Sequence, residues 1–231
     1  MRHEINESPI NPLPLVVWAL VLPMIAAELV FGLAGAGLLG GSGGIGMRNS
    51  AIQQTAFIPE LFQRMWAVGA VDGNVYRLFS YPFVHVSPVH AMFVIVFTLA
   101  LGNMIAAQFR PAALIALFFG SGAVAALIYT GFSMAWRGRV EPLIGGYPAV
   151  YGLVGAFTFL IWTRLAETGG NRLRAFTLIG MLLLFQLVFG VMFGAGTAWI
   201  ADITGFFVGF GLSFLLIHGG LARAMALIRQ R

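Results

Sequence analysis

Six long apolar segments restrict what this chain can fold into more than any other feature of its sequence. A helix needs about 20 mostly apolar residues to cross a membrane. Lipid offers backbone groups no hydrogen-bond partner, so segments of this kind satisfy their own amides as helices. We therefore predict an all-α, polytopic membrane protein whose six transmembrane helices cover about Leu13–Leu39, Ser87–Ala107, Pro111–Met134, Pro148–Thr163, Leu173–Phe193 and Trp199–His218.

The composition agrees with this class and excludes several others. Of 231 residues, 59% are hydrophobic and only 9% are charged, which is too little polar surface for a soluble domain of this size. The chain has no cysteine, which excludes disulfides and thiolate metal sites. Its arginines flank apolar segments and form no long basic run, so we expect lipid headgroups and not nucleic acid as partners. We expect no cofactor and no metal.

The arginines also predict an orientation. With both termini cytoplasmic, eight arginines fall on the cytoplasmic side and five on the other, and this bias is the one seen in membrane proteins. We expect a multi-pass protein of the bacterial cytoplasmic membrane. Residues 1–12 form a cytoplasmic tail, residues 13–220 the membrane domain, and residues 221–231 an Arg-rich cytoplasmic tail.

The first loop, roughly Gly40–Val86, is long for a bundle of six helices. It opens with "GGSGGIG", which predicts a flexible hinge. The stretch "IPELFQRMW" follows and is too short to span a membrane, so we predict a helix in the interface plane. Its apolar residues share one face of a helix, at positions i, i+3, i+4, i+7 and i+8: Ile58, Leu61, Phe62, Met65 and Trp66.

Two carboxylates lie within predicted spans, where an unpartnered charge is costly. For Glu28 we expect an ordinary helix-end group that reaches water. Asp202 lies in the outer third of the last span, one turn before Gly205 and Gly209. This G-x-x-x-G pattern lets two helix backbones approach closely, and we expect the helix that begins in "GGYPAVYGLVGA" to be its partner.

His85 and His90 enter the second span five residues apart. At this spacing two helical side chains diverge by about 140°, so they do not form the i, i+4 pair of a helical zinc site. Spacing alone favours two interfacial polar residues whose nitrogens are satisfied by loop backbone.

Four stretches together resemble the rhomboid family, the six-helix intramembrane serine proteases. The resemblance runs from about Tyr76 to Gly211. "YRLFSYPFVH" is similar to the end of the family's tryptophan–arginine loop, and "HVSPVHAMFV" to its second-helix histidine motif. "GGYPAVYGLVG" resembles the G-x-S-G turn that leads into the fourth helix, and "ADITGFFVG" resembles the A-H-x-x-G-x-x-x-G of the sixth. The resemblance implies a rhomboid-like bundle with a long loop and an interfacial helix between its first two spans.

The departures from the family pattern fall on the chemistry. The resemblance places the nucleophilic serine at Tyr147 and the glycine after it at Pro148. It places the general-base histidine at Asp202 and the oxyanion asparagine at Val94. The residues that it retains are His85, His90, Gly145 and Tyr151, the last matching an aromatic that packs on the family's catalytic histidine.

These exchanges predict a catalytically inactive homologue. The Tyr147 ring fills the space of a substrate carbonyl, Asp202 is a weaker and shorter base than histidine, and Val94 offers no donor. Pro148 also removes a backbone N–H beside the nucleophile position. Inactive rhomboids bind transmembrane segments of other proteins, and we expect the same role here. Three alternatives stay open: a protease with unorthodox chemistry, a transporter or channel that uses Asp202, Glu28 and the histidines, and a structural subunit of a membrane complex.

The exchanged pair suggests a replacement for the catalytic dyad. We hypothesise a hydrogen bond from the Tyr147 hydroxyl to the Asp202 carboxylate that holds the fourth helix to the sixth. The alternative is that Tyr147 turns outward to the membrane interface, which leaves Asp202 to water or to Tyr151.

Overall fold

Helices make up the fold of this chain. The computed structural model describes residues 13–136, 138–193 and 196–217, so the predicted tails lie outside the described residues. Within these ranges there is no strand, only two isolated bridges, Phe57 with Leu143 and Phe109 with Ile217. The elements are α1 (Leu15–Gly35), η1 (Gly41–Gly44), α2 (Met47–Thr55), α3 (Pro59–Val68), η2 (Gly73–Tyr76), α4 (Arg77–Ser80), η3 (Tyr81–Phe83), α5 (Pro88–Ala106), α6 (Pro111–Ala135), α7 (Tyr147–Glu167), η4 (Arg172–Phe176), α8 (Thr177–Phe193) and α9 (Trp199–Leu216).

Five of the described helices are long and apolar enough to cross a membrane: α1, α5, α6, α7 and α9. Prolines in the first turn start α5, α6 and α7, where the missing N–H has no helical partner anyway. The predicted span Pro148–Thr163 extends to Glu167. The predicted span Leu173–Phe193 is divided, because the Asn171 side chain caps a separate turn, η4. Helix α8 then has 17 residues, about 25 Å of helix, against the ~30 Å thickness of a bilayer core.

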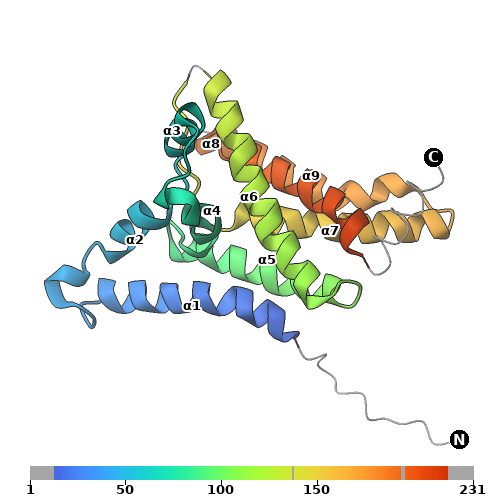
Figure 1. Ribbon diagram of the computed structural model, residues 1–231. Helices are drawn as coiled ribbons and strands as arrows, with labels where there is room; N and C mark the ends of the chain where they lie inside the picture. Colours follow the sequence, from blue (N-terminus) through green and yellow to red (C-terminus); the bar gives the residue numbers. More distant parts are fainter. Residues whose placement is uncertain (1–12, 137, 194–195, 218–231) are drawn as a thin grey trace, which may run out of the picture.

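Helix α7 occupies the centre of the bundle and packs against α5, α6 and α9 (Figure 1). Eleven of its residues are buried, among them Gly152 and Gly155. The predicted contact with the G-x-x-x-G pattern of α9 is present. A Cβ built on Gly209 would lie 2.0 Å from the Gly152 carbonyl oxygen, and one built on Gly205 would lie 2.1 Å from the Pro148 carbonyl oxygen. The two backbones therefore touch, and only glycine fits.

The long loop between α1 and α5 is more regular than the sequence predicts. The glycine-rich hinge contains an ordered turn, η1. Gly40 before this turn and Gly46 before α2 are both in the left-handed conformation, at φ 72° and 94°. A helix that was not predicted, α2, follows it. Arg77 donates to the Gln53 and Ala56 carbonyls, at 3.0 and 2.8 Å, and so ties the end of α2 to α4.

The predicted interfacial helix exists as α3, but protein covers part of its apolar face. Phe62 is 2% exposed and packs against Phe57, with ring centroids 4.4 Å apart and the rings tilted by 32°. The helix packs along α6, and Gln63 donates to the Ser133 hydroxyl at 2.7 Å. Trp66, in contrast, is 47% exposed. The periodicity identifies an apolar face, but only the tertiary structure divides it between α6 and the surroundings.

Candidate functional site

A tight turn before α7 builds the site. Phe57 and Leu143 exchange backbone hydrogen bonds of 3.0 and 2.9 Å, and the Gly145 N–H donates to the Tyr81 carbonyl at 2.9 Å. Gly145 then turns the chain at φ 90°, in the left-handed region that favours glycine. A Cβ there would also lie 2.7 Å from Cε1 of His90. The first glycine of the motif is therefore required for its backbone conformation and for the approach of the histidines.

The two histidines lie against this turn. His85 is fully buried in the loop before α5, and its Nε2 accepts from the Gly146 N–H at 3.4 Å, so its neutral ring carries the proton on Nδ1. His90 lies in the first turn of α5, its ring edge-on to His85 with centroids 5.2 Å apart. The prediction that loop backbone satisfies both rings holds only for Nε2 of His85, because Nδ1 of His85 and Nε2 of His90 are buried without a partner among the described residues.

The environment of His85 keeps its ring neutral. Burial lowers the pKa of His85 to about 3, and the nearby His90 and Arg48 contribute to the same shift. An imidazolium would have to lose its hydration without gaining an anion. In the described structure no carboxylate bonds to this ring, so at neutral pH it serves as an uncharged acceptor for the turn.

Tyr147 and Asp202 do not pair with each other. The Tyr147 ring stacks on His90, with centroids 4.7 Å apart and 18° between the planes. The Asp202 carboxylate is 5% exposed and accepts from Nε2 of Gln186 at 2.7 Å. No Tyr147–Asp202 hydrogen bond is present between these described side chains, so the predicted lock is wrong. An amide from α8 reaches the carboxylate, and aromatic stacking holds the tyrosine elsewhere.

Gln186 is the site residue that sequence reasoning missed. It is the one amide, and with Thr177 the only side chain with a polar N or O atom, in the apolar sequence of α8. A lone amide in a membrane helix is a signal for an interhelical hydrogen bond. The sequence gives no indication of its partner, because the bond joins two helices whose facing sides depend on the whole bundle.

Val94 and Tyr151 pack around the same turn. Val94 is fully buried, and its Cγ1 would lie 2.7 Å from a Cβ built on Gly146. It therefore closes the space below the turn and offers no donor. Tyr151 is 3% exposed, one turn into α7.

Tyr81 donates to the Gly122 carbonyl at 3.0 Å, and burial, with Asp202 adding to it, raises the pKa of Tyr81 well above its usual value.

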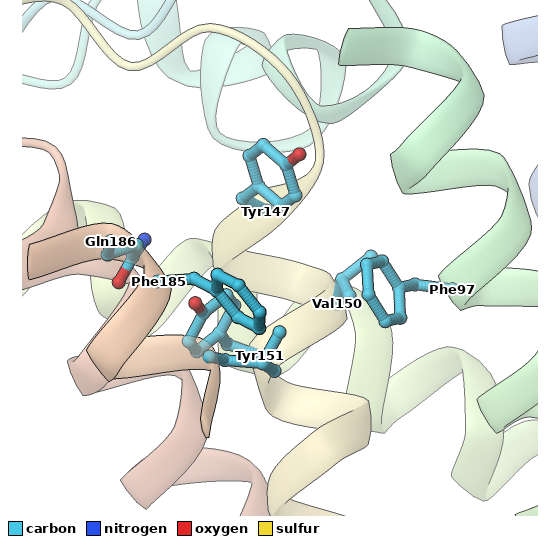
Figure 2. Close-up of a pocket in the computed structure, with 7 residues that line it drawn as sticks. Phe97, Tyr147, Val150, Tyr151, Phe185 and Gln186 are labelled. Carbon is cyan, nitrogen blue, oxygen red and sulfur yellow. The ribbon is translucent and has the colours of Figure 1, made fainter. Parts of the chain in front are cut away.

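A cavity of about 260 Å³ lies between α5, α7 and α8, beside Tyr147 (Figure 2). In Figure 2 the Tyr151 hydroxyl is turned to the side where Gln186 lies, and the Tyr147 hydroxyl points to the opposite side. The remaining walls are apolar. The lining residues are Phe97, Tyr147, Val150, Tyr151, Leu182, Phe185 and Gln186.

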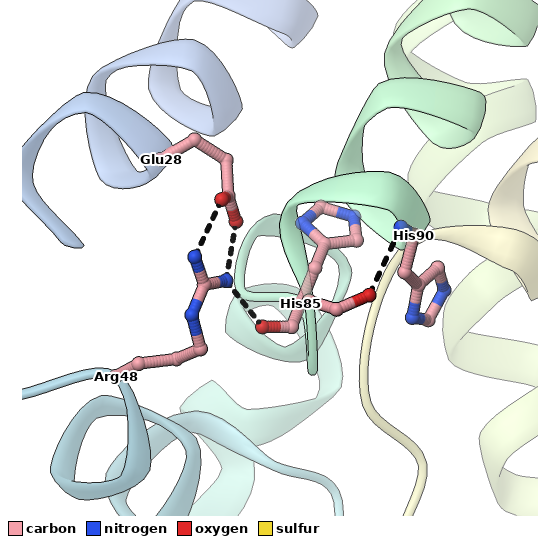
Figure 3. A network of polar contacts seen from close by, with 5 residues as sticks. Glu28, Arg48, His85 and His90 are labelled. Carbon is pink, nitrogen blue, oxygen red and sulfur yellow. Dashed lines mark hydrogen bonds and ion pairs between the residues drawn. The ribbon is translucent and has the colours of Figure 1, made fainter. Parts of the chain in front are cut away.

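Glu28 forms an ion pair, whereas the sequence predicted a helix-end group that reaches water. Its two carboxylate oxygens each accept from Arg48 at 2.7 Å, and the same guanidinium donates to the His85 carbonyl at 2.9 Å (Figure 3). The Arg48 and Glu28 side chains are only 19% and 16% exposed. One arginine therefore joins α1, α2 and the loop that carries His85. Among the described residues, no group of three or more His, Asp or Glu lies close enough together to hold a metal ion.

This arrangement defines a polytopic helical membrane protein whose central helix begins at a glycine turn, beside two histidines and a buried carboxylate. A family model described as the Rhomboid domain matches residues 72–219, well over half of the chain. The chain belongs to the rhomboid family, and the resemblance drawn from its motifs is confirmed. No curated protein matches the chain.

Proposed function

We propose that this protein is a catalytically inactive rhomboid that binds transmembrane segments of other proteins, in assembly, trafficking or quality control. One observation carries the proposal: Tyr147 stacks on His90 while Asp202 is engaged by Gln186. A hydrolase of this kind needs a hydroxyl in contact with a base. Here the residues at the nucleophile and base positions have different partners, and face-to-face stacking does not direct the phenol at an imidazole nitrogen.

The surroundings of the turn support the same proposal. Val94 and Pro148 supply no donor, and the Gly146 N–H already donates to His85. Loss of one oxyanion donor typically lowers kcat about 10²- to 10³-fold. A tetrahedral oxyanion formed beside Tyr147 would find these groups absent or engaged.

Client binding is supported by the open side of the bundle. Helix α8 exposes Met181, Leu184 and Phe185 by 53–60%, and the cavity lies between α8 and α5. An apolar surface beside a mostly apolar cavity with a few polar groups suits a transmembrane segment, since helices associate in lipid through close packing and hydrogen bonds. We place the protein in a bacterial cytoplasmic membrane with both termini in the cytoplasm.

A transport role has less support. The described residues that line the cavity do not include Glu28 or either histidine. Glu28 is paired with Arg48 at the other side of the His85 loop, so the groups of a proton path do not line one passage.

Reconstituted protein tests the inactive assignment. We expect no cleavage of a transmembrane substrate and no labelling by a fluorophosphonate above the level of Tyr147→Phe. Labelling that this variant abolishes would establish the protein as a protease.

Site-directed photocrosslinking tests client binding in native membranes. A photoreactive residue in place of Phe185 is expected to capture transmembrane proteins. The matched control is the same residue in place of Phe207, which is 65% exposed on α9. Equal capture at both positions would reflect collisions in the bilayer and contradict a binding face at α8.

A further inference from the structure

The hydrogen bond between Gln186 and Asp202 joins α8 to α9, and α8 is loosely packed against the rest of the bundle. Helix α8 contacts mainly α7 and η4, and it exposes several large apolar side chains. The amide of Gln186 crosses from α8 to the Asp202 carboxylate of α9 at 2.7 Å. It is the only side-chain hydrogen bond between α8 and α9 among the described residues.

The acceptors around this bond receive few hydrogen bonds. The Asp202 carboxylate receives one hydrogen bond from the described residues. Oε1 of Gln186 is buried and has no partner there. A buried acceptor without a donor is destabilising, and a buried carboxylate more so. These acceptors can therefore take a further donor, whereas another ionised carboxylate would add acceptors and no donor.

The cavity beside this bond is small but large enough to admit a side chain. Its volume is about 260 Å³, below the ~300–1,000 Å³ typical of small-molecule pockets. Gln186 and Tyr151 form its polar side, and Phe97, Phe185 and Leu182 its apolar walls. A single long side chain projecting from a helix that lies against α5 and α8 has the required shape.

We propose that this cavity takes a hydrogen-bond-donating side chain, such as lysine or asparagine, from a client's transmembrane segment. The donor binds Oε1 of Gln186 and shares or replaces the Gln186 amide at Asp202. This inference rests on the proposed binding function and specifies the client that the site selects: a segment with one polar donor at the depth of Asp202. Hydrogen bonds from the donor to the oxygens of Gln186 and Asp202 carry the selection.

The test uses the full-length protein in liposomes and a leucine-rich transmembrane peptide with lysine, asparagine, leucine or aspartate at its centre. Binding is measured by energy transfer between labels. We expect the lysine and asparagine peptides to bind about 3- to 20-fold more tightly than the leucine peptide, the range of one interhelical hydrogen bond in a membrane. The aspartate peptide is expected to bind most weakly.

Two variants separate selection from a structural effect. Asp202→Leu and Gln186→Leu should each reduce the preference for lysine over leucine, because each variant removes one of the two acceptors that the donor is proposed to bind. Gly211→Ala is the matched control on α9, since a Cβ there meets nothing within 4 Å. Equal binding of all peptides to the wild-type protein would overturn this inference and leave the binding function standing. Absence of binding by every peptide would overturn both.

Discussion

His85 and Asp202 show two ways of holding a titratable side chain inside an apolar bundle. His85 remains neutral and accepts a single backbone hydrogen bond from Gly146. Asp202 accepts a hydrogen bond from the side-chain amide of Gln186, which lies on another helix. Both residues lie near the turn before α7: His85 accepts from Gly146, and Gly205, one turn after Asp202, meets the Pro148 carbonyl.

The state of His85 predicts a dependence of stability on pH. Its pKa is about 3 in the folded protein and about 6.5 when unfolded, so between these values the unfolded chain binds more protons. Stability is complete above pH 6.5 and falls as the pH drops toward 3, by up to about 1.4 kcal/mol per unit. Thermal unfolding in detergent at pH 7.5 and 5.0 measures this.

His85→Phe provides the comparison. This variant loses the acceptor for Gly146, so it should be less stable at pH 7.5, but its stability should decrease less toward pH 5.0 because the titrating group is absent. Identical pH slopes for the variant and the wild-type protein would assign the acid sensitivity to another group.

The Glu28–Arg48 pair is predicted to contribute to stability more than a surface ion pair does. Both side chains are mostly buried and joined by two hydrogen bonds of 2.7 Å. Exposed pairs contribute ~0–1 kcal/mol, whereas hydrogen bonds to charged groups contribute about 1.5–3 kcal/mol. A double-mutant cycle with Glu28→Gln and Arg48→Met should therefore give a coupling above about 1 kcal/mol. Arg64→Met, at an exposed position on α3, is the control with no expected effect. Additive losses in the cycle would contradict the coupling.

At the scale of elements, the contact between α7 and α9 depends on glycine. The sequence predicts both the contact and its partners, because G-x-x-x-G and the glycines after Tyr147 are local patterns with a physical meaning. The structure adds which carbonyls are touched. Gly209 meets Gly152, and Gly205 meets Pro148.

Gly209→Ala is expected to destabilise the protein strongly. Its Cβ would lie 2.0 Å from the Gly152 carbonyl oxygen, and backbone cannot yield as a side-chain end does. Overpacking typically costs about 1–3 kcal/mol, and occasionally more. Gly211→Ala on the same helix meets nothing within 4 Å and should be neutral. Unfolding of the two variants in detergent measures the difference, and similar stability would show that the helices separate easily.

The helix boundaries show where local patterns are sufficient. The starts of α5, α6 and α7 were predicted to within a residue, because Pro88, Pro111 and Pro148 mark a first helical turn. The division between η4 and α8 was not, since hydropathy is continuous there and the break depends on the cap that Asn171 provides. The ordered glycine turn before α2 was also missed, because composition alone does not distinguish a flexible segment from a fixed one.

At the scale of the molecule, the class and family were predictable, whereas the pairing of side chains was not. Apolar segments and the order of the motifs are properties of neighbouring residues along the chain, so they can be read from the sequence without the three-dimensional structure. The partners of Asp202 and Glu28 come from segments 16 and 20 residues away, and each competes with other polar groups. Which partner succeeds depends on helix rotation, so the lock from Tyr147 to Asp202 was a reasonable prediction that proved wrong.

The orientation of the whole bundle is the last prediction. Figure 1 shows α2 and the turn that joins α7 to α8 at opposite ends of the bundle. The excess of arginines predicts that the α7–α8 turn, with Arg164, Arg172 and Arg174 at its borders, lies in the cytoplasm. Single cysteines can report this because the chain has none of its own. A cysteine at Ser50, exposed on α2, should react with a membrane-impermeant maleimide in intact cells. One at Thr168, exposed at the other end, should react only after permeabilisation. The reverse pattern would invert the topology and place the candidate site near the cytoplasmic face.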